Sequence, residues 1–371
     1  MARLFGVETS RADILSRVGD IEQLIRAKPH MLSEGFEDGL RGIDVVNASG
    51  LAFSILPGRG MDISTASFNG RPLAWRSATS DTHPAYFDHE GENGRGWLRG
   101  FYGGLVVTCG LTWAGANGSD DGKNFGLHGR ISNTPAVGVS CKGTWDGDEY
   151  ELAVTGRMRE ATVFGENLEM ERTITTRLGS PELLITDTVR NLGPRPQEHM
   201  LLYHINIGYP VVNAGARLVA PTMRAEPRDQ DAREDADRYA DIDGPRNGYR
   251  EKVYFHDMAA DEAGFVTAAI CNPWCDSGSG QGLGVYVKYR PDLLPRFTEW
   301  KMLDSGTYVV GMEPANCSVL GRPSERAAGT LQVLEGGAER TYSLRIGVLS
   351  DNRQLEAHER QCAARTGNSS E

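Results

Sequence analysis

Apolar residues along most of this chain recur at every second position, in short runs separated by turn-forming residues. This period predicts β-strands with one buried face. We expect strands over residues 42–46, 51–56, 150–157, 168–178, 183–191, 284–289, 308–313, 329–334 and 340–348. The sharpest pair flanks Gly179-Ser180-Pro181-Glu182 and predicts an antiparallel hairpin. Strands and helices do not alternate, so the pattern favours an all-β fold over a parallel α/β sheet.

The first forty residues show a different pattern. Between residues 10 and 28, apolar side chains recur every three or four positions, which predicts an amphipathic helix. Ser10 followed by Asp13 suits the start of that helix, and Pro29 suits its end. We therefore expect three parts: an N-terminal helical extension over residues 1–41, a β-domain over residues 42–350 and a C-terminal tail over residues 351–371.

Two internal segments interrupt the strand pattern. Residues 81–99 contain two histidines, Trp97 and several glycines, and we interpret them as a long structured loop. Residues 224–250 are dense in Asp, Glu and Arg with almost no apolar residues, which predicts a solvated excursion. Strand-like patterning resumes on both sides of each segment, so neither is interpreted as a domain linker.

Composition narrows the class of protein. The 371 residues include 39 basic and 50 acidic side chains, a net charge of −11, and 39% are hydrophobic, which is ample for a core. An acidic chain without a basic run is poorly suited to bind nucleic acid or anionic membranes. No apolar run is long enough to span a bilayer, and no signal-peptide pattern follows Met1, so a cytoplasmic location is expected. The six cysteines are scattered, and we interpret them as buried thiols.

Two histidines lie in unusual local sequences. His128 is flanked by Gly126 and Gly129, which would let other groups approach the imidazole closely. His204 lies in a β-prone run over residues 201–209, where Leu202, His204 and Asn206 share one face. Such a face could form the wall of a binding site, or it could simply face solvent.

Glu313 and Arg59 are the next candidates. Glu313 closes the apolar strand over residues 308–312, and burial there would raise its pKa toward the range of a general base. A charged strand end at the surface is the alternative. Arg59 lies between two glycines with Asp62 nearby, where it could bind a ligand hydroxyl or form a structural ion pair. His256 lies beside an aspartate, and this pair alone is weak evidence for a functional site.

The sequence lacks the motifs of several common kinds of enzyme. The sequence has no dinucleotide-binding glycine motif, no phosphate-binding loop, no HExxH and no GxSxG, and no histidine pair has metal-ligand spacing. We therefore expect a site without metal or cofactor, built from His, Glu, Arg and aromatic residues. That combination suits a sugar, because sugar proton transfer needs only one acid and one base. The candidate aromatic platforms are Trp113, Trp300, Tyr203 and Tyr209.

At these residues the chain resembles the aldose 1-epimerase, or galactose mutarotase, superfamily, and more closely its bacterial, DUF4432-like branch of uncharacterised function. The resemblance is carried by five short pieces in a specific order and spacing. They are Leu56-Pro57-Gly58-Arg59-Gly60-Met61-Asp62-Ile63, Gly126-Leu127-His128-Gly129-Arg130, Asp187-Thr188-Val189-Arg190-Asn191-Leu192-Gly193, Leu202-Tyr203-His204-Ile205-Asn206 and Val310-Gly311-Met312-Glu313-Pro314. The resemblance implies a large antiparallel β-supersandwich whose concave face binds a sugar.

The same resemblance implies roles for individual residues. His204 would be the general acid at the ring oxygen, Glu313 the base at the anomeric hydroxyl, and His128 a hydrogen-bonding partner of the substrate. The expected substrate-binding residues are Arg59, Asp62, Arg130, Asn206, Trp300, Lys301 and His256. The chain departs from the family in Phe125-Gly126-Leu127 before His128, where an Asn is usual, and in the charges at Arg130 and at Thr298-Glu299-Trp300-Lys301. An acidic or modified sugar could use Arg130 or Lys301.

The leading functional hypothesis is therefore a metal-independent mutarotase, an isomerase that interconverts the anomers of a free sugar or sugar derivative. The first alternative is an isomerase, epimerase or lyase that acts on a keto or modified sugar with the same residues. The second alternative is a catalytically silent carbohydrate-binding protein. The expected partner is a small sugar, and a homo-oligomer is left open.

Overall fold

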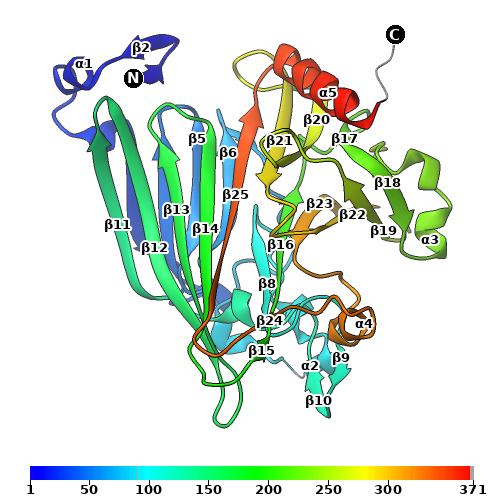
Figure 1. The fold of residues 1–371 in the computed structure, drawn as a ribbon. Coiled ribbons are helices and arrows are strands. Elements are labelled where there is room, and N and C mark those ends of the chain that lie inside the picture. Colours follow the sequence, from blue (N-terminus) through cyan, green and yellow to red (C-terminus); the bar gives the residue numbers. More distant parts are fainter. Residues whose placement is uncertain (90, 368–371) are drawn as a thin grey trace.

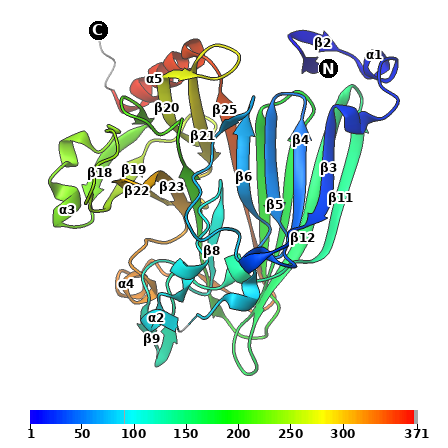
Figure 2. The same ribbon diagram turned by 180° about the vertical axis from the view of Figure 1, so that it is seen from behind.

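Three antiparallel sheets of five or more strands organise the computed structural model, which describes residues 1–89 and 91–367 (Figures 1 and 2). The five-stranded and eight-stranded sheets lie face to face, as both views show. Their inner side chains, such as Ile43 and Phe53 from one sheet and Val154 and Met170 from the other, belong to one buried apolar cluster. The expectation of an all-β, antiparallel fold is confirmed.

The eight-stranded sheet contains the predicted hairpin. Its strands, in spatial order, are β11 (Val137–Asp146), β12 (Glu149–Ala161), β13 (Asn167–Arg177), β14 (Glu182–Asn191), β25 (Glu339–Leu349), β21 (Gln281–Tyr289), β20 (Val266–Asp276) and β17 (Arg217–Val219). β13 and β14 pair antiparallel across residues 179–182, with Ile174 opposite Ile185. Every second residue of β13 is buried, which is the period-two pattern of the sequence.

The other two large sheets carry the remaining long strands. The five-stranded sheet has the order β3 (Ile25–Met31), β4 (Arg41–Asn47), β5 (Leu51–Leu56), β6 (Asp62–Phe68) and β7 (Arg71–Pro72). The six-stranded sheet has the order β18 (Thr222–Pro227), β19 (Lys252–Met258), β22 (Arg296–Asp304), β23 (Thr307–Ala315), β16 (Met200–Ile207) and β8 (Val107–Leu111). Three two-stranded sheets pair β1 (Ala2–Leu4) with β2 (Val7–Thr9), β9 (Gly118–Asp120) with β10 (Lys123–Phe125), and β15 (Gln197–Glu198) with β24 (Val333–Leu334).

The predicted strands are confirmed with one partial exception. Of the predicted strand over residues 329–334, only β24 (Val333–Leu334) forms, because the backbone N–H groups of residues 330 and 331 donate to the Glu325 carbonyl oxygen of the helix α4 (Arg322–Ala327). The other α-helices are α1 (Arg11–Leu15), α2 (Gly91–Gly94), α3 (Gln230–Arg233) and α5 (Asn352–Thr366). The 3₁₀ turns are η1 (Ile21–Gln23), η2 (Gly35–Glu37), η3 (Pro84–Tyr86), η4 (Gly96–Arg99), η5 (Ile131–Asn133) and η6 (Ala236–Arg238).

The predicted helix over residues 10–28 is wrong. Ser10 does cap a helix, since its Oγ accepts a hydrogen bond from the Asp13 backbone at 3.1 Å, but α1 ends at Leu15. The chain then forms β3, which pairs with β4 along its whole length and buries Ile25. Pairing with a sheet therefore outweighs the helical period, and the edge position of β3 tolerates Pro29, which cannot donate a backbone hydrogen bond.

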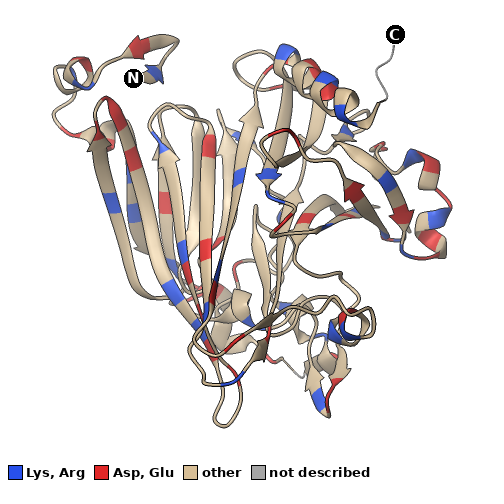
Figure 3. Ribbon diagram, in the orientation of Figure 1, with Lys and Arg blue, Asp and Glu red and all other residues tan. Residues whose placement is uncertain are grey.

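Residues 224–250 are more ordered than predicted. They contain the end of β18, α3 and η6, and they bury Ala232, Ile242 and Tyr249. Figure 3 shows both blue and red residues along the ribbon around α3, and none of the charged residues between 224 and 250 is buried. The acidic and basic sequence therefore marks only the outer side of a packed cover. The loop over residues 81–99 is confirmed, and its described residues, 81–89 and 91–99, contain only short helical turns. Within residues 1–89 and 91–367, no helix is long and apolar enough to cross a membrane.

Candidate active site

The neighbouring strands β16 and β23 bring His204 and Glu313 together. Ile205 pairs with Met312 in the antiparallel register of these strands, which places His204 opposite Glu313 on one face of the six-stranded sheet. His204 Nε2 lies 3.2 Å from Glu313 Oε1, and both side chains are buried. Two side chains that are 109 positions apart in the chain thus form one acid–base pair because their strands are hydrogen-bonded neighbours.

The His204–Glu313 pair lies at a cavity of about 470 Å³ whose walls include the aromatic rings of Trp75, Trp97, Phe101 and Trp300. Trp97 stacks on Phe101 at a ring-centroid distance of 4.3 Å. Phe101 and Trp300 each lie 5.2 Å from the His204 ring, in edge-on arrangements. An apolar cavity with a few convergent polar groups is the usual form of a small-molecule site.

His128 reaches the same cavity from a strained loop. Its φ is 58°, and its ring lies 5.7 Å from the His204 ring and 4.6 Å from the Trp97 ring. The Gly115 backbone N–H donates to His128 Nδ1 at 3.4 Å. The flanking glycines serve the backbone rather than the imidazole: a Cβ on Gly129 would lie 2.3 Å from the Trp113 carbonyl oxygen, so only glycine fits.

Burial favours the uncharged form of both members of the pair. Removal from water, with a smaller contribution from Glu251, raises the pKa of Glu313 to about 8. Burial, with a smaller contribution from His128, lowers the pKa of His204 to about 3. Burial also lowers the pKa of His128 to about 4. At neutral pH the pair therefore holds one proton, which resides on Glu313, while His204 is neutral.

A polar bridge forms one side of the cavity. Glu251 accepts a hydrogen bond from Trp300 Nε1 at 3.1 Å and another from Arg228 Nη2 at 3.0 Å. Arg228 also donates to Asp229 at 2.8 Å. Because Glu251 fixes the indole plane of Trp300, the bridge sets the orientation of an aromatic wall. We did not expect Arg228 or Glu251 at a site, since the sequence around them resembles an ordinary charged surface.

Arg59 is not at the cavity, contrary to expectation. It is buried, and its guanidinium donates to the carbonyl oxygens of Ser132 at 2.7 Å, Thr82 at 2.6 Å and Gly100 at 2.9 Å. All three of these hydrogen bonds go to backbone oxygens, and the buried guanidinium does not line the cavity. Because the bonded carbonyls at residues 82 and 100 bracket the segment that carries Trp97, Arg59 positions the aromatic wall from behind.

Other expected substrate-binding residues also lie away from the cavity. Asp62 accepts hydrogen bonds from Thr108 and pairs with the buried Arg172 at 2.8 Å. Asn206 donates to the backbone oxygens of Gly104 and His204. Arg130 is exposed and does not line the cavity. The structure therefore does not bring these residues together with His204 and Glu313, and Asp62 and Asn206 make contacts with neighbouring strands and turns instead.

His256 and Lys301 lie under the 224–250 cover. His256 bonds Thr222 at 3.0 Å and lies 3.4 Å from Glu299, and Lys301 donates to the Tyr239 and Asp241 carbonyl oxygens. Side chains alternate along β22, so Trp300 faces the cavity while its neighbours Glu299 and Lys301 face the opposite side. Of the expected set, the structure brings His128, His204, Trp300 and Glu313 together.

The other aromatic candidates have different environments. Trp113 is buried and stacks on Phe125, the Tyr203 hydroxyl donates to Asp187, and Tyr209 is exposed away from the cavity. Trp75, Trp97 and Phe101 form the walls instead. Among the described residues, no group of three or more His, Cys, Asp or Glu side chains is placed to hold a metal ion.

Comparison with known proteins identifies relatives. The chain matches the family model described as "Domain of unknown function (DUF4432)" over residues 37–348. A solved structure of a proposed aldose 1-epimerase from Klebsiella pneumoniae is 28% identical, with 93% of this chain and 88% of that chain covered and a TM-score of 0.87. No curated protein matches the chain.

More distant structures share the fold. A galactose mutarotase-like protein from Clostridium acetobutylicum is 13% identical, with 88% of this chain and 99% of that chain covered and a TM-score of 0.56. A galactose 1-epimerase from Lactobacillus acidophilus is 10% identical, with 88% and 100% covered and a TM-score of 0.55. The resemblance to the aldose 1-epimerase superfamily is confirmed at the level of fold, and the chain belongs to the DUF4432 family.

Proposed function

We propose that this protein is a sugar isomerase of the aldose 1-epimerase type, which interconverts the anomers of a free sugar or sugar derivative. The observation that carries the proposal is the His204–Glu313 pair, 3.2 Å apart at an aromatic-walled cavity. The similarity to the Klebsiella pneumoniae protein, which is named for this activity, supports the same assignment.

The His204–Glu313 pair contains the acid and the base that opening of a sugar ring requires. The hydroxyl oxygen and the ring oxygen of a cyclic sugar are bonded to the same anomeric carbon, so two groups as close as His204 Nε2 and Glu313 Oε1 reach both oxygens at once. One group takes the proton of the anomeric hydroxyl while the other gives a proton to the ring oxygen. The bond from the anomeric carbon to the ring oxygen breaks as the aldehyde forms. One proton enters the pair and one leaves it, so no net charge develops.

The pKa shifts favour one starting arrangement. Since Glu313 carries the proton at neutral pH, Glu313 donates to the ring oxygen and the neutral His204 Nε2 accepts the hydroxyl proton. This resting arrangement is the reverse of the roles implied by the family resemblance. After rotation about the bond to the second carbon, the ring closes on the other face with the roles exchanged, as microscopic reversibility requires.

The cavity walls explain how a sugar would be held. The apolar face of a pyranose ring packs against aromatic rings, here those of Trp97, Phe101 and Trp300. Its hydroxyl groups would meet His128, Arg228 and Glu251, which provide both donors and acceptors. Bound sugar excludes water from the pair, which strengthens each hydrogen bond to the reacting oxygens.

Saturation-transfer NMR on a panel of pure aldoses tests the proposal. We expect accelerated exchange between the two anomeric proton signals of at least one sugar, and loss of the acceleration in His204→Gln and Glu313→Gln. Glu262→Gln, at an exposed carboxylate, is the matched control. Exchange of the second- or third-carbon proton with deuterated water would instead indicate the isomerase, epimerase or lyase alternative. Binding without any exchange would indicate a silent sugar-binding protein.

A further inference from the structure

A second cavity adjoins the proposed active site. Its volume is about 530 Å³, and its walls come from residues 36, 78–80, 82, 83, 86, 87, 96, 98–100 and 133. Two side chains, Thr79 and Leu98, belong to the walls of both cavities. The two hollows are therefore neighbours on either side of one ridge, and a ligand that leaves the first cavity over Thr79 and Leu98 enters the second.

The second cavity has an exposed aromatic platform. Phe36 is 61% exposed and Tyr86 is 56% exposed, and their rings lie 5.0 Å apart at 89°. The two rings are fixed to each other, since the His83 backbone N–H donates to the Phe36 carbonyl oxygen at 2.7 Å and η3 carries Tyr86. Two adjacent, solvent-exposed aromatic side chains at the edge of a cavity form a surface on which the apolar face of a ligand can be buried.

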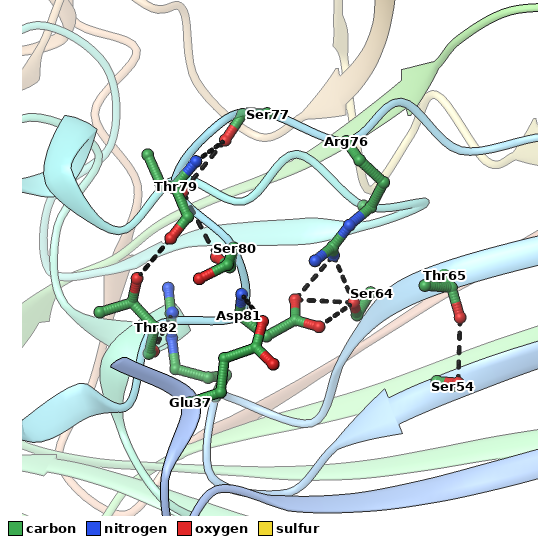
Figure 4. A network of polar contacts seen from close by, with 12 residues as sticks. Glu37, Ser54, Ser64, Thr65, Arg76, Ser77, Thr79, Ser80, Asp81 and Thr82 are labelled. Atoms are coloured by element: carbon green, nitrogen blue, oxygen red, sulfur yellow. Dashed lines mark hydrogen bonds and ion pairs between the residues drawn. The ribbon is translucent and has the colours of Figure 1, made fainter. Parts of the chain in front are cut away.

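The ridge between the cavities is held by a polar network (Figure 4). The Asp81 carboxylate accepts from Ser64 at 2.7 Å and pairs with Arg76 at 2.6 Å, and the Asp81 backbone N–H donates to Glu37 at 3.0 Å. Thr82 donates to the Thr79 carbonyl oxygen at 2.9 Å. The network therefore holds the segment over residues 79–82, which lines the second cavity and reaches the first through Thr79. A wall that is held in place before a ligand binds lowers the conformational cost of binding.

Polar groups complete the second cavity. His83 Nδ1 accepts from the Ala85 backbone N–H at 3.1 Å, and within the described residues its Nε2 has no partner. The Asn133 amide donates to Ser132, and within the same residues its carbonyl oxygen has no partner. Aromatic faces beside a donor and an acceptor that are open to solvent match a sugar ring, which has apolar C–H faces and hydroxyl groups around its edge.

We propose that the second cavity is a subsite for a further sugar ring, so that the substrate class is a reducing disaccharide or longer saccharide rather than a free monosaccharide. The reducing ring occupies the His204–Glu313 cavity, and the next ring crosses Thr79 and Leu98 to stack on Phe36 and Tyr86. This inference rests on the proposed function, because the position of the reducing ring follows from the acid–base pair.

Calorimetric binding is the test, because it does not depend on catalysis. The probes are maltose, cellobiose, lactose and isomaltose, each compared with glucose, which forms its reducing end. We expect at least one disaccharide to bind about tenfold or more tightly than glucose, and Phe36→Ala with Tyr86→Ala to remove that gain. Both side chains are exposed, so the double variant keeps the fold. Phe164→Ala, at an exposed ring that lines neither cavity, is the matched control.

Monosaccharide exchange separates this inference from the proposed function. The double variant leaves the exchange rate of a monosaccharide unchanged if the subsite binds only the second ring. The inference is overturned if every disaccharide binds no more tightly than glucose, or if the gain survives in the double variant. It is also overturned if the double variant changes the oligomeric state and not disaccharide affinity, since the aromatic platform then serves self-association.

Discussion

Replacing Glu313 with glutamine keeps the shape of a protonated carboxyl group and removes its ability to ionise. The native carboxyl holds its proton up to a pKa of about 8, whereas in the unfolded chain it titrates near its ordinary value of 4.5. A raised native pKa means that the folded state binds more protons than the unfolded state between these values. The stabilising effect is therefore complete below pH 4.5 and is lost as the pH rises through 8.

The comparison of wild type with Glu313→Gln between pH 6.5 and 8 isolates this effect. His204 and His128 have lowered pKa values in the native state, and their unfolded forms still lose protons as the pH rises above 6.5. Both proteins contain these histidines, so their contribution cancels in the difference and only the Glu313 contribution remains among these three groups. At about 1.4 kcal/mol per pH unit, the wild type loses about 2 kcal/mol of unfolding free energy between pH 6.5 and 8 through Glu313.

Urea unfolding followed by tryptophan fluorescence measures the difference between wild type and Glu313→Gln at each pH. We expect the variant to gain about 2 kcal/mol relative to the wild type from pH 6.5 to 8, while its sugar exchange activity is lost. Glu262→Gln, which changes an exposed side chain, gives a difference that does not vary with pH. Parallel curves for wild type and Glu313→Gln would refute the assignment of a buried, protonated carboxyl group.

Three further predictions follow from the same contacts. In the exchange assay, His204→Gln lowers the rate by about 10²–10⁴ and changes sugar affinity little, and a variant with wild-type activity would remove His204 from the reaction. Arg59→Met leaves three buried carbonyl oxygens without their donor, so urea unfolding shows a loss of about 3 kcal/mol or more, whereas an unchanged midpoint would contradict the positioning role. The exchange rate of the wild type falls above about pH 8, where Glu313 loses the shared proton, and a rate that keeps rising to pH 9 would exclude Glu313 as the starting donor.

The sequence predicted the meeting of His204 and Glu313 better than the positions of the other expected residues, for a physical reason. His204 and Glu313 each occupy a strand whose period fixes the direction of the side chain, and neighbouring strands then bring the two together. Arg59 lies in a turn, where no period fixes direction, and its guanidinium turns inward to backbone carbonyls. Arg228 could not be distinguished from surface charge, because only the folded chain places it against Glu251.

The prediction of a helix in the N-terminal segment fails for a related reason. The apolar spacing over residues 10–28 fits a helix, but Ile25 gains more by pairing and burial beside Asn47 than a short isolated helix provides. Strand pairing is a property of two segments, so a pattern in one segment cannot reveal it. The proposed division at residue 41 stays a prediction, although β3 already belongs to the five-stranded sheet.

The position of β25 has a consequence for synthesis. This strand lies between β14 and β21 in the sheet. It begins at Glu339, which is 148 positions after the end of β14 at Asn191 and 50 positions after the end of β21 at Tyr289. Until it emerges from the ribosome, the eight-stranded sheet exists as two pieces with open edges, and unpaired edges invite association with other chains. Closure of the sheet is therefore a late event with high contact order, and a chaperone that protects such edges would act on this protein before its last strand is made.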